Sequence, residues 1–289
     1  MRLRIDLAYD GGGFKGWARQ PSLRTVQGEL EAALATALRL PEVQVVCAGR
    51  TDTGVHARGQ VTHVDVDPTV LAATAGRAAP TPIASLHRRL NGILPNDVRI
   101  HGVGEAPEGF DARFSAVWRR YAYRVADLPQ VQDPLTRNHV LHWRAPLDLD
   151  AMNEASAMLI GLNDFASFCK KREGATTIRT LLDFHWYRDA DERAVATVRA
   201  DAFCHSMVRA LVGCLLAVGD GRKPPEWARD VLVMGKRDAA VAVVAPHGLT
   251  LEEVGYPPAG QLALQAEKAR ARREPHEGGQ HSDEELHHG

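Results

Sequence analysis

The feature that most constrains the fold is one order of strand and helix patterns that occurs twice along the chain. Between residues 3 and 103, apolar residues follow the order strand, helix, strand, strand, helix, strand. A similar order begins again near Arg119 and continues to about Val254. This is the order of the split βαβ unit. The sequence therefore predicts an α+β chain of two ferredoxin-like halves with largely antiparallel sheets.

Individual segments give the expected positions of these elements. Leu3, Ile5 and Leu7 alternate with more polar residues as in a strand, and Thr25 stands where a helix N-cap is expected. Expected first-half strands are 3–8, 43–47, 61–66 and 98–103, with helices at 26–38 and 85–94. Expected second-half strands are 119–125, 178–187, 194–200 and one near residue 254, with helices at 148–160, 205–218 and 225–234.

Glycine and proline mark the join between the halves. Gly104, Pro107 and Gly109 are typical of a linker. The predicted organisation is a first half at 1–108, a second half at 109–256 and a tail at 257–289.

Two stretches lie outside the repeated pattern. Residues 71–84 are rich in alanine, threonine and proline, and we interpret them as an exposed loop without an assigned function. The tail permits a helix up to Arg273 and then becomes rich in glycine, histidine and acids, which predicts disorder.

The overall charge of the chain gives little support for a nucleic-acid partner. Its formal net charge is -1, whereas phosphate binding usually comes from an excess of lysine and arginine. The charges are unevenly spread, however: residues 111–124 hold four arginines and one acid, and the tail from residue 274 holds five acids and no lysine or arginine. A near-neutral total can therefore conceal a basic face.

The cysteines and the apolar segments indicate the compartment. Cys47, Cys169, Cys204 and Cys214 form no C-x-x-C pair, so we expect reduced, packed thiols rather than disulfides or a zinc site. No signal peptide precedes the first strand, and no uncharged apolar run is long enough to span a membrane. We therefore expect a soluble, cytoplasmic protein without a membrane partner.

A loop with a glycine at each end holds the most informative side chain. Residues 48–56 read AGRTDTGVH, which places Asp52 between Gly49 and Gly54 and beside Arg50. Glycine permits backbone angles closed to other residues, so this frame suits a tight loop that aims a short carboxylate. An aspartate in such a turn more often caps its own backbone. The spacing alone leaves both readings open.

A resemblance to a known family favours the functional reading. Five segments, spread in order between about residues 5 and 256, resemble the tRNA pseudouridine synthase A family. The Asp52 loop continues into Gly59-Gln60-Val61, which extends that family's active-site signature. The other matching segments are Tyr9 to Gly11 with Gly16 to Gln20, Phe110 to Ser115 with Arg119 to Tyr121, Asn163 to Phe168, and Phe203 to Arg209.

The resemblance implies a fold and a reaction. The fold is the pseudouridine-synthase type, with two halves side by side and a central cleft. The reaction converts uridine to pseudouridine in the anticodon stem-loop of tRNA, at positions 38, 39 and 40. No metal or other cofactor is implied, and the sequence contains no dinucleotide-binding fingerprint, Walker loop or His-Glu-x-x-His motif. The family also implies a homodimer.

Roles for individual residues follow from the same resemblance. Asp52 is the implied nucleophile, acting at C6 of the base or at C1′ of the ribose, or as a base at C2′. The implied substrate-binding residues are Tyr121, which would stack on the extruded uracil, Arg50, and Arg209 as the charge partner of Asp52. The expected RNA-binding residues are Arg19, Arg113, Arg119 and Arg120. His56 and His205 flank the site and are given no catalytic role.

Two alternatives stay open at this point. One is a pseudouridine synthase that acts on another RNA site. The other is a non-catalytic RNA-binding protein, because split βαβ halves also occur in RNA-recognition modules. The aromatic-rich RNP1 pattern of those modules is missing from the sequence.

Overall fold

The structure is a computed structural model that describes residues 1–75, 79–170, 176–236 and 238–271. Its strands are β1 (Arg2–Tyr9), β2 (Val46–Cys47), β3 (His56–Asp65), β4 (Val98–Glu105), β5 (Trp118–Ala126), β6 (Leu141–His142), β7 (Gly161–Asp164), β8 (Ile178–Arg188), β9 (Ala194–Ala200) and β10 (Leu249–Gly255). Its α-helices are α1 (Val26–Leu38), α2 (Pro68–Ala73), α3 (Pro82–Ile93), α4 (Leu149–Ala157), α5 (Met207–Gly219), α6 (Trp227–Val233) and α7 (Leu262–Ala271).

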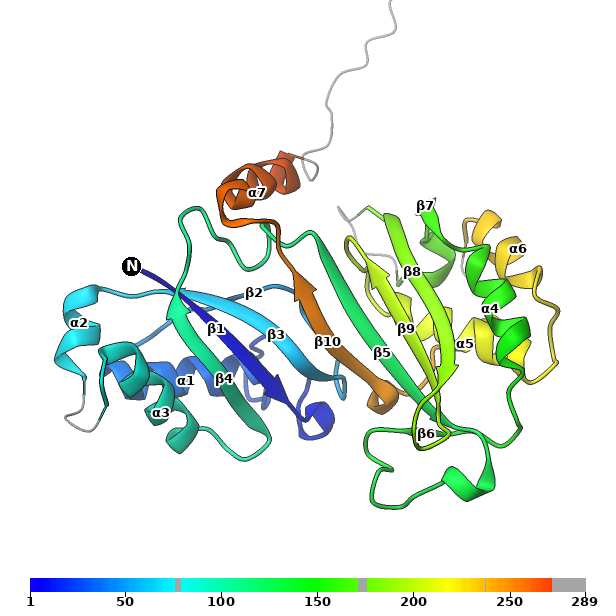
Figure 1. Cartoon of the computed structure of the whole chain (residues 1–289), viewed down its shortest axis with the longest axis horizontal. Coiled ribbons are helices and arrows are strands. Elements are labelled where there is room, and N and C mark those ends of the chain that lie inside the picture. The colour runs from blue at the N-terminus through cyan, green and yellow to red at the C-terminus, as the bar shows by residue number, and fades with distance from the viewer. Residues whose placement is uncertain (76–78, 171–175, 237, 272–289) are drawn as a thin grey trace, which may run out of the picture.

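The described strands form one continuous sheet (Figure 1). Its order is β4-β1-β3-β10-β5-β9-β8-β7, with β2 beside β3 and β6 beside β5. Most pairs are antiparallel, and the parallel ones are β10 with β3 and β5 with β6. The predicted α+β class with a largely antiparallel sheet is therefore confirmed.

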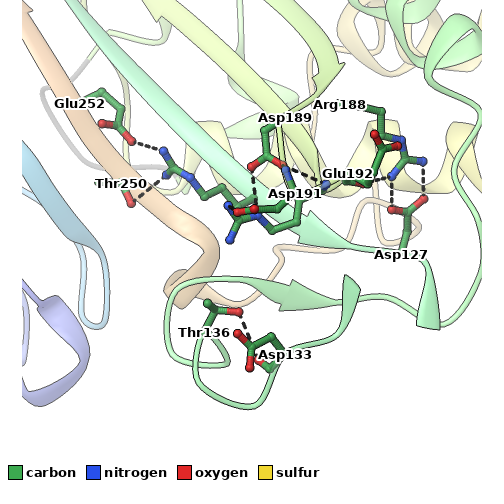
Figure 2. A network of polar contacts seen from close by, with 11 residues as sticks. Asp127, Asp133, Thr136, Arg188, Asp189, Asp191, Glu192, Thr250 and Glu252 are labelled. Atoms are coloured by element: carbon green, nitrogen blue, oxygen red, sulfur yellow. Dashed lines mark hydrogen bonds and ion pairs between the residues drawn. The ribbon is translucent and has the colours of Figure 1, made fainter. Parts of the chain in front are cut away.

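Strand β10 lies in the middle of this sheet and joins the strands of the first half of the sequence to those of the second. It comes from the end of the second half of the sequence, yet it lies between β3 of the first half and β5 of the second. Glu252 on β10 accepts a hydrogen bond from Arg58 on β3 at 2.9 Å and one from Arg124 on β5 at 2.7 Å. Figure 2 shows Glu252 and Thr250 of this strand both joined by dashed lines to one guanidinium, that of Arg124. We call the β3-β10-β5 region the seam.

The helices other than α7 pack as two groups, one beside each end of the sheet (Figure 1). Helices α1 and α3 contact each other in the first group, and α4 and α5 contact each other in the second. The Thr25 hydroxyl caps α1 by accepting a hydrogen bond from Gly28 N. Apart from Arg209, every residue of α5 is buried, so this helix is central to the core. The N-terminal end of α5, with Arg209 in its first turn and His205 just before it, lies against the loop that carries Asp52.

A second polar network fixes the outer end of β5. The carboxylate of Asp127 is fully buried and accepts hydrogen bonds from Arg188 on β8, at 2.7 Å for the Nη2 donor, and from Leu147 N at 2.9 Å. Figure 2 shows this pair beside the turn that contains Asp189, Asp191 and Glu192. A buried charge needs a partner of this kind to offset its lost hydration.

Both ends of the 71–84 stretch differ from the predicted exposed loop. Leu71 is buried in α2 and α3 begins at Pro82, while residues 76–78 lie outside the described residues. Asp67 and Thr81 cap these two helices, and a proline follows each cap at the first helical position. In the sequence, the pairs Asp67-Pro68 and Thr81-Pro82 indicate the starts of these two helices.

The cysteine prediction is wrong for two residues. Cys169 and Cys204 form a disulfide, with their Cα atoms 5.7 Å apart. The two cysteines are 35 positions apart in sequence, and only the packing of α5 against the segment after β7 brings them together. Cys47 and Cys214 are free and buried, as expected, and burial raises the pKa of each thiol to about 12.

The end of the chain is described only in part. Helix α7 occupies 262–271, above the seam in Figure 1. The predicted disorder after Arg273 lies outside the described residues. None of the helices in the described ranges combines the length and the apolarity needed to cross a membrane.

Candidate active site

The loop between β2 and β3 presents Asp52 through a tight turn. Val55 N donates a hydrogen bond to Asp52 O at 3.1 Å, and Gly54 at the third position of this turn has φ +78°. A Cβ at Gly54 would also lie 2.8 Å from Pro246. Glycine is therefore required there, as the sequence predicts. Gly49 differs, because its φ is not positive and a Cβ built on it has nothing within 4 Å.

Three segments hold the loop against the sheet. Trp17 N donates a hydrogen bond to the carbonyl of Thr51 at 3.0 Å, and the Thr51 hydroxyl lies 2.8 Å from the Tyr9 hydroxyl. Gln60 on β3 donates from its amide nitrogen to the carbonyl of Gly49 at 2.7 Å. These contacts fix the backbone of the residues just before Asp52, so the carboxylate extends from a rigid part of the loop.

Three side chains surround the carboxylate of Asp52: Arg209 from the first turn of α5, and Ser206 and His205 from the residues just before that helix. His205 Nε2 lies 3.5 Å from Oδ1, while the Ser206 hydroxyl donates to Oδ2 at 3.4 Å. Arg209 Nη1 lies 3.8 Å from the same Oδ2. The side chain of Asp52 remains 31% exposed, so the carboxylate is both held and accessible. The two halves of the sequence thus meet at this residue.

Arg209 is fixed by the backbone of another segment. Its Nε donates a hydrogen bond to Val244 O at 2.7 Å, and Val244 N donates to Arg209 O. The guanidinium keeps Nη1 for the contact with Asp52. The structure therefore brings together Asp52 and the charge partner expected for it.

Tyr121 lies on β5 with its ring buried beside the site. The ring packs edge-on against Phe203, with centroids 5.1 Å apart and an interplanar angle of 90°. Burial raises the pKa of the Tyr121 phenol, and the charge of Asp52 raises it further. The phenol is therefore protonated at neutral pH and lies within electrostatic range of the carboxylate.

The other predicted arginines do not converge on Asp52. Arg50 is exposed and has no ion pair within the part of the chain that the structure describes. Arg113 is exposed over the ring of Phe114. Two are paired on the surface: Arg19 lies 3.3 Å from Glu42, and Arg120 lies 3.0 Å from Glu253.

Arg119 differs from the expected phosphate contact. Its guanidinium donates to the carbonyls of Ala48 at 2.8 Å, Arg113 at 2.9 Å and Asp201 at 2.8 Å. Burial lowers the pKa of this guanidinium. Ala48 precedes the Asp52 loop and Asp201 precedes the His205 segment. Arg119 therefore joins both functional segments to β5 and uses its donors within the protein.

Sequence reasoning missed two residues that touch Asp52. It gave His205 no role and did not consider Ser206. The spacing from His205 to Arg209 is no guide, because α5 begins only at Met207 and the left-handed turn at Ser206 breaks the helical register between the two residues. That Ser206 also reaches the carboxylate depends on backbone angles that the sequence does not display.

One group of described side chains has the spacing of a metal site. Asp10, His56 and His139 place one ligand atom each within 4.8 Å of one another. Both ring nitrogens of His56 already have partners, because Gly11 N donates to Nδ1 at 2.9 Å and Nε2 lies 3.1 Å from His247 O. An ion could bind there only by breaking one of these contacts, so the geometry does not favour a metal.

Known proteins resemble this chain over nearly its whole length. The sequence profile of a family described as tRNA pseudouridine synthase matches residues 155–257. A tRNA pseudouridine synthase A of Streptomyces griseus is 58% identical over 272 residues, which cover 93% of each chain. The protein of the same name from Frankia casuarinae is 56% identical over 95% of this chain and 96% of its own. That of Mycobacterium leprae is 48% identical over 92% and 93%.

Proposed function

The chain belongs to the tRNA pseudouridine synthase A family, and we propose from this premise that Asp52 is the nucleophile of its reaction. As a member of that family, the protein is an isomerase that converts uridine to pseudouridine in tRNA. The reaction breaks the bond between N1 and C1′, forms a bond between C5 and C1′, and moves a proton from C5 to N1. No atom is gained or lost.

The observation that carries the proposal is the position of the Asp52 carboxylate. It extends from a braced loop, retains 31% exposure, and faces Arg209 and His205 across the join of the two halves. A partly desolvated carboxylate needs nearby positive charge or hydrogen-bond donors, and these residues supply them. The arrangement suits attack on C6 or on C1′, and it equally suits abstraction of the C2′ proton.

Tyr121 and Arg50 complete the proposed substrate site. Extruding a base from a helix costs a few kcal/mol, and stacking on an aromatic ring returns about 1–3 kcal/mol. The ring of Tyr121 is held edge-on by Phe203 and can supply that surface. Arg50 is exposed next to Asp52 in the loop, where its charge can brace the RNA backbone or fill the space that the base leaves.

Recognition of the tRNA belongs to the same proposal. We infer that the anticodon stem-loop binds, with modification at positions 38, 39 and 40, and that Arg19, Arg113 and Arg120 contact phosphates. Arg120 and Arg19 would exchange their surface carboxylates for phosphate, a small cost because exposed ion pairs contribute about 0–1 kcal/mol. Arg119 is left out, because its donors serve the backbone.

The proposed setting is a cytoplasmic homodimer of two-half subunits. The halves 1–108 and 109–256 would be related split βαβ units, with the substrate in a cleft between their helix groups. Twofold dimers are the commonest assembly. Sedimentation equilibrium that gives the mass of one 31.6 kDa chain would exclude the dimer.

The test of the proposed function locates the product. Purified protein is incubated with an unmodified tRNA transcript, and pseudouridine is mapped along the RNA. We expect it within the anticodon arm. Product only elsewhere would mean a synthase for another site, and stable binding without any product would mean a non-catalytic RNA-binding protein.

A further inference from the structure

We propose that Ser206 is a positioning residue for Asp52: a strained backbone directs its hydroxyl onto one carboxylate oxygen and thereby fixes the orientation of the nucleophile. The inference rests on the proposed role of Asp52. Ser206 stands immediately before α5, where a serine side chain would ordinarily cap the helix.

The first observation is that Ser206 does not cap its helix. Serine before a helix usually accepts a hydrogen bond from the second or third helical N–H. Here Ser206 occupies the N-cap position of α5 and makes no side-chain cap hydrogen bond. Its hydroxyl donates instead to Oδ2 of Asp52 at 3.4 Å. The usual stabilising contact is given up for one with the functional carboxylate.

The second observation is the backbone conformation that makes this possible. Ser206 has φ 63° and ψ 8°, which is the left-handed region. Residues other than glycine and asparagine rarely adopt this conformation, and they keep it only where the surrounding structure enforces it. The helix-capping geometry needs extended angles instead. The left-handed backbone therefore turns the hydroxyl away from α5 and towards the loop.

The surroundings hold Ser206 from both sides. Cys204 is tied to Cys169 by the disulfide, and its carbonyl accepts a hydrogen bond from Met207 N at 3.1 Å. Lys170 N donates to the carbonyl of His205 at 3.0 Å, and Met207 is fully buried. The segment from 204 to 207 cannot relax to extended angles without breaking these contacts.

The consequence is that the two oxygens of Asp52 are not equivalent. Oδ2 faces both Ser206 and Arg209, whereas Oδ1 faces His205. A hydrogen bond to one oxygen limits rotation of the carboxylate about its last bond. Holding a reactive group near its attack geometry raises the rate of the chemical step more than it raises affinity.

Two substitutions distinguish the effect of the Ser206 hydroxyl from the effect of its strained backbone. Ser206→Gly and Ser206→Ala both remove the hydroxyl, but only glycine accepts the left-handed angles freely. Ser22 provides the matched control, because it is an exposed serine with φ 60°. The same two changes are made there. Each variant is measured for the single-turnover rate on a tRNA transcript, the Kd for that tRNA and the melting temperature.

We expect Ser206→Gly and Ser206→Ala to slow the single-turnover step equally, by about tenfold, with the Kd within about twofold of wild type. Ser206→Gly should melt at a higher temperature than Ser206→Ala, because alanine keeps the Cβ that strains the left-handed angles and glycine does not. The Ser22 variants should repeat the difference in melting temperature without any loss of rate. A Ser206→Gly enzyme at the wild-type rate would overturn the proposal, because the hydroxyl would then be idle.

A double variant separates this inference from the proposed function. If Asp52→Glu retains measurable activity, adding Ser206→Gly should change that activity by less than the factor seen in wild type, since the geometry is already lost. Full activity of Asp52→Ala would refute the role of Asp52 itself. An unchanged tenfold loss in the Asp52→Glu background would instead refute only the contact through Ser206.

Discussion

At the scale of single residues, β5 offers two buried tyrosines with different duties. Tyr121 and Tyr123 are two positions apart and lie on the same face of the strand. The Tyr123 hydroxyl donates to Ala245 O at 2.7 Å, whereas the Tyr121 ring faces Phe203 and the charge of Asp52. The Tyr123 hydroxyl therefore stabilises the fold, whereas the Tyr121 hydroxyl is available to the substrate.

This difference predicts opposite outcomes for one substitution. Tyr121→Phe should keep the affinity for tRNA and the stability but impair turnover. Tyr123→Phe should lower the unfolding free energy by about 1 kcal/mol, because the partly buried carbonyl of Ala245 loses its donor, and leave the turnover of folded enzyme unchanged. Urea titration and single-turnover assays measure both quantities. Unchanged turnover in Tyr121→Phe would show that its hydroxyl takes no part.

Residue identities alone predicted only part of the site. Asp52, Arg209 and Tyr121 were found through segments that resemble a family, and the structure places them around one point. The contacts of His205 and Ser206 with Asp52 were missed, because they depend on the left-handed turn at Ser206 and on the way α5 meets the loop. Neither can be read from spacing.

At the scale of elements, Arg119 predicts a coupling between two loops. Arg119→Gln should leave the carbonyls of Ala48 and Asp201 without their donor and cost about 2–3 kcal/mol of unfolding free energy. Turnover should also fall, because these carbonyls flank the Asp52 and His205 segments. The matched Arg120→Gln change touches an exposed pair and should leave stability within about 0.5 kcal/mol. Equal stability of the two variants would contradict the interpretation of Arg119.

The disulfide between Cys169 and Cys204 is a second link between elements. It closes a stretch of 35 positions, for which loop entropy predicts roughly 4 kcal/mol of stabilisation. Dithiothreitol should therefore lower the urea midpoint of the wild-type protein and have no effect on Cys169→Ser. A wild-type midpoint that ignores dithiothreitol would show that the bond contributes nothing.

The sequence predicted the positions of helices and strands better than it predicted which strands pair with each other. Thr25 and the apolar stripe that follows it identify α1, because capping and helical periodicity are local. The insertion of β10 between β3 and β5 pairs segments nearly two hundred positions apart, as Thr250 beside His56 shows. No local pattern records such a pairing.

At the scale of the whole molecule, buried histidines determine how stability responds to acid. Burial lowers the pKa of His56, His63 and His247 below the ordinary 6.5. As the pH falls through 6.5, the unfolded chain takes up these protons first, so acid favours unfolding. The unfolding free energy should therefore decrease between about pH 7 and pH 5.

Urea midpoints across this range measure the effect. The salt-bridged Asp65 and Asp97 cannot cause it, because their pKa values lie below the ordinary 3.8 and their contribution is lost only at lower pH. His63→Gln, which keeps a polar side chain beside Ala112 N, should reduce the slope. A midpoint that stays constant from pH 7 to pH 5 would contradict this account.

The most direct test of the central claim is the activity of Asp52→Asn on a tRNA that the wild-type protein modifies. Asparagine has nearly the same shape and can still face Ser206, so binding of the tRNA should be retained. We predict tRNA affinity within about twofold of wild type and no pseudouridine above background in single-turnover assays. Pseudouridine formed at the wild-type rate would contradict the assignment of Asp52 as the nucleophile.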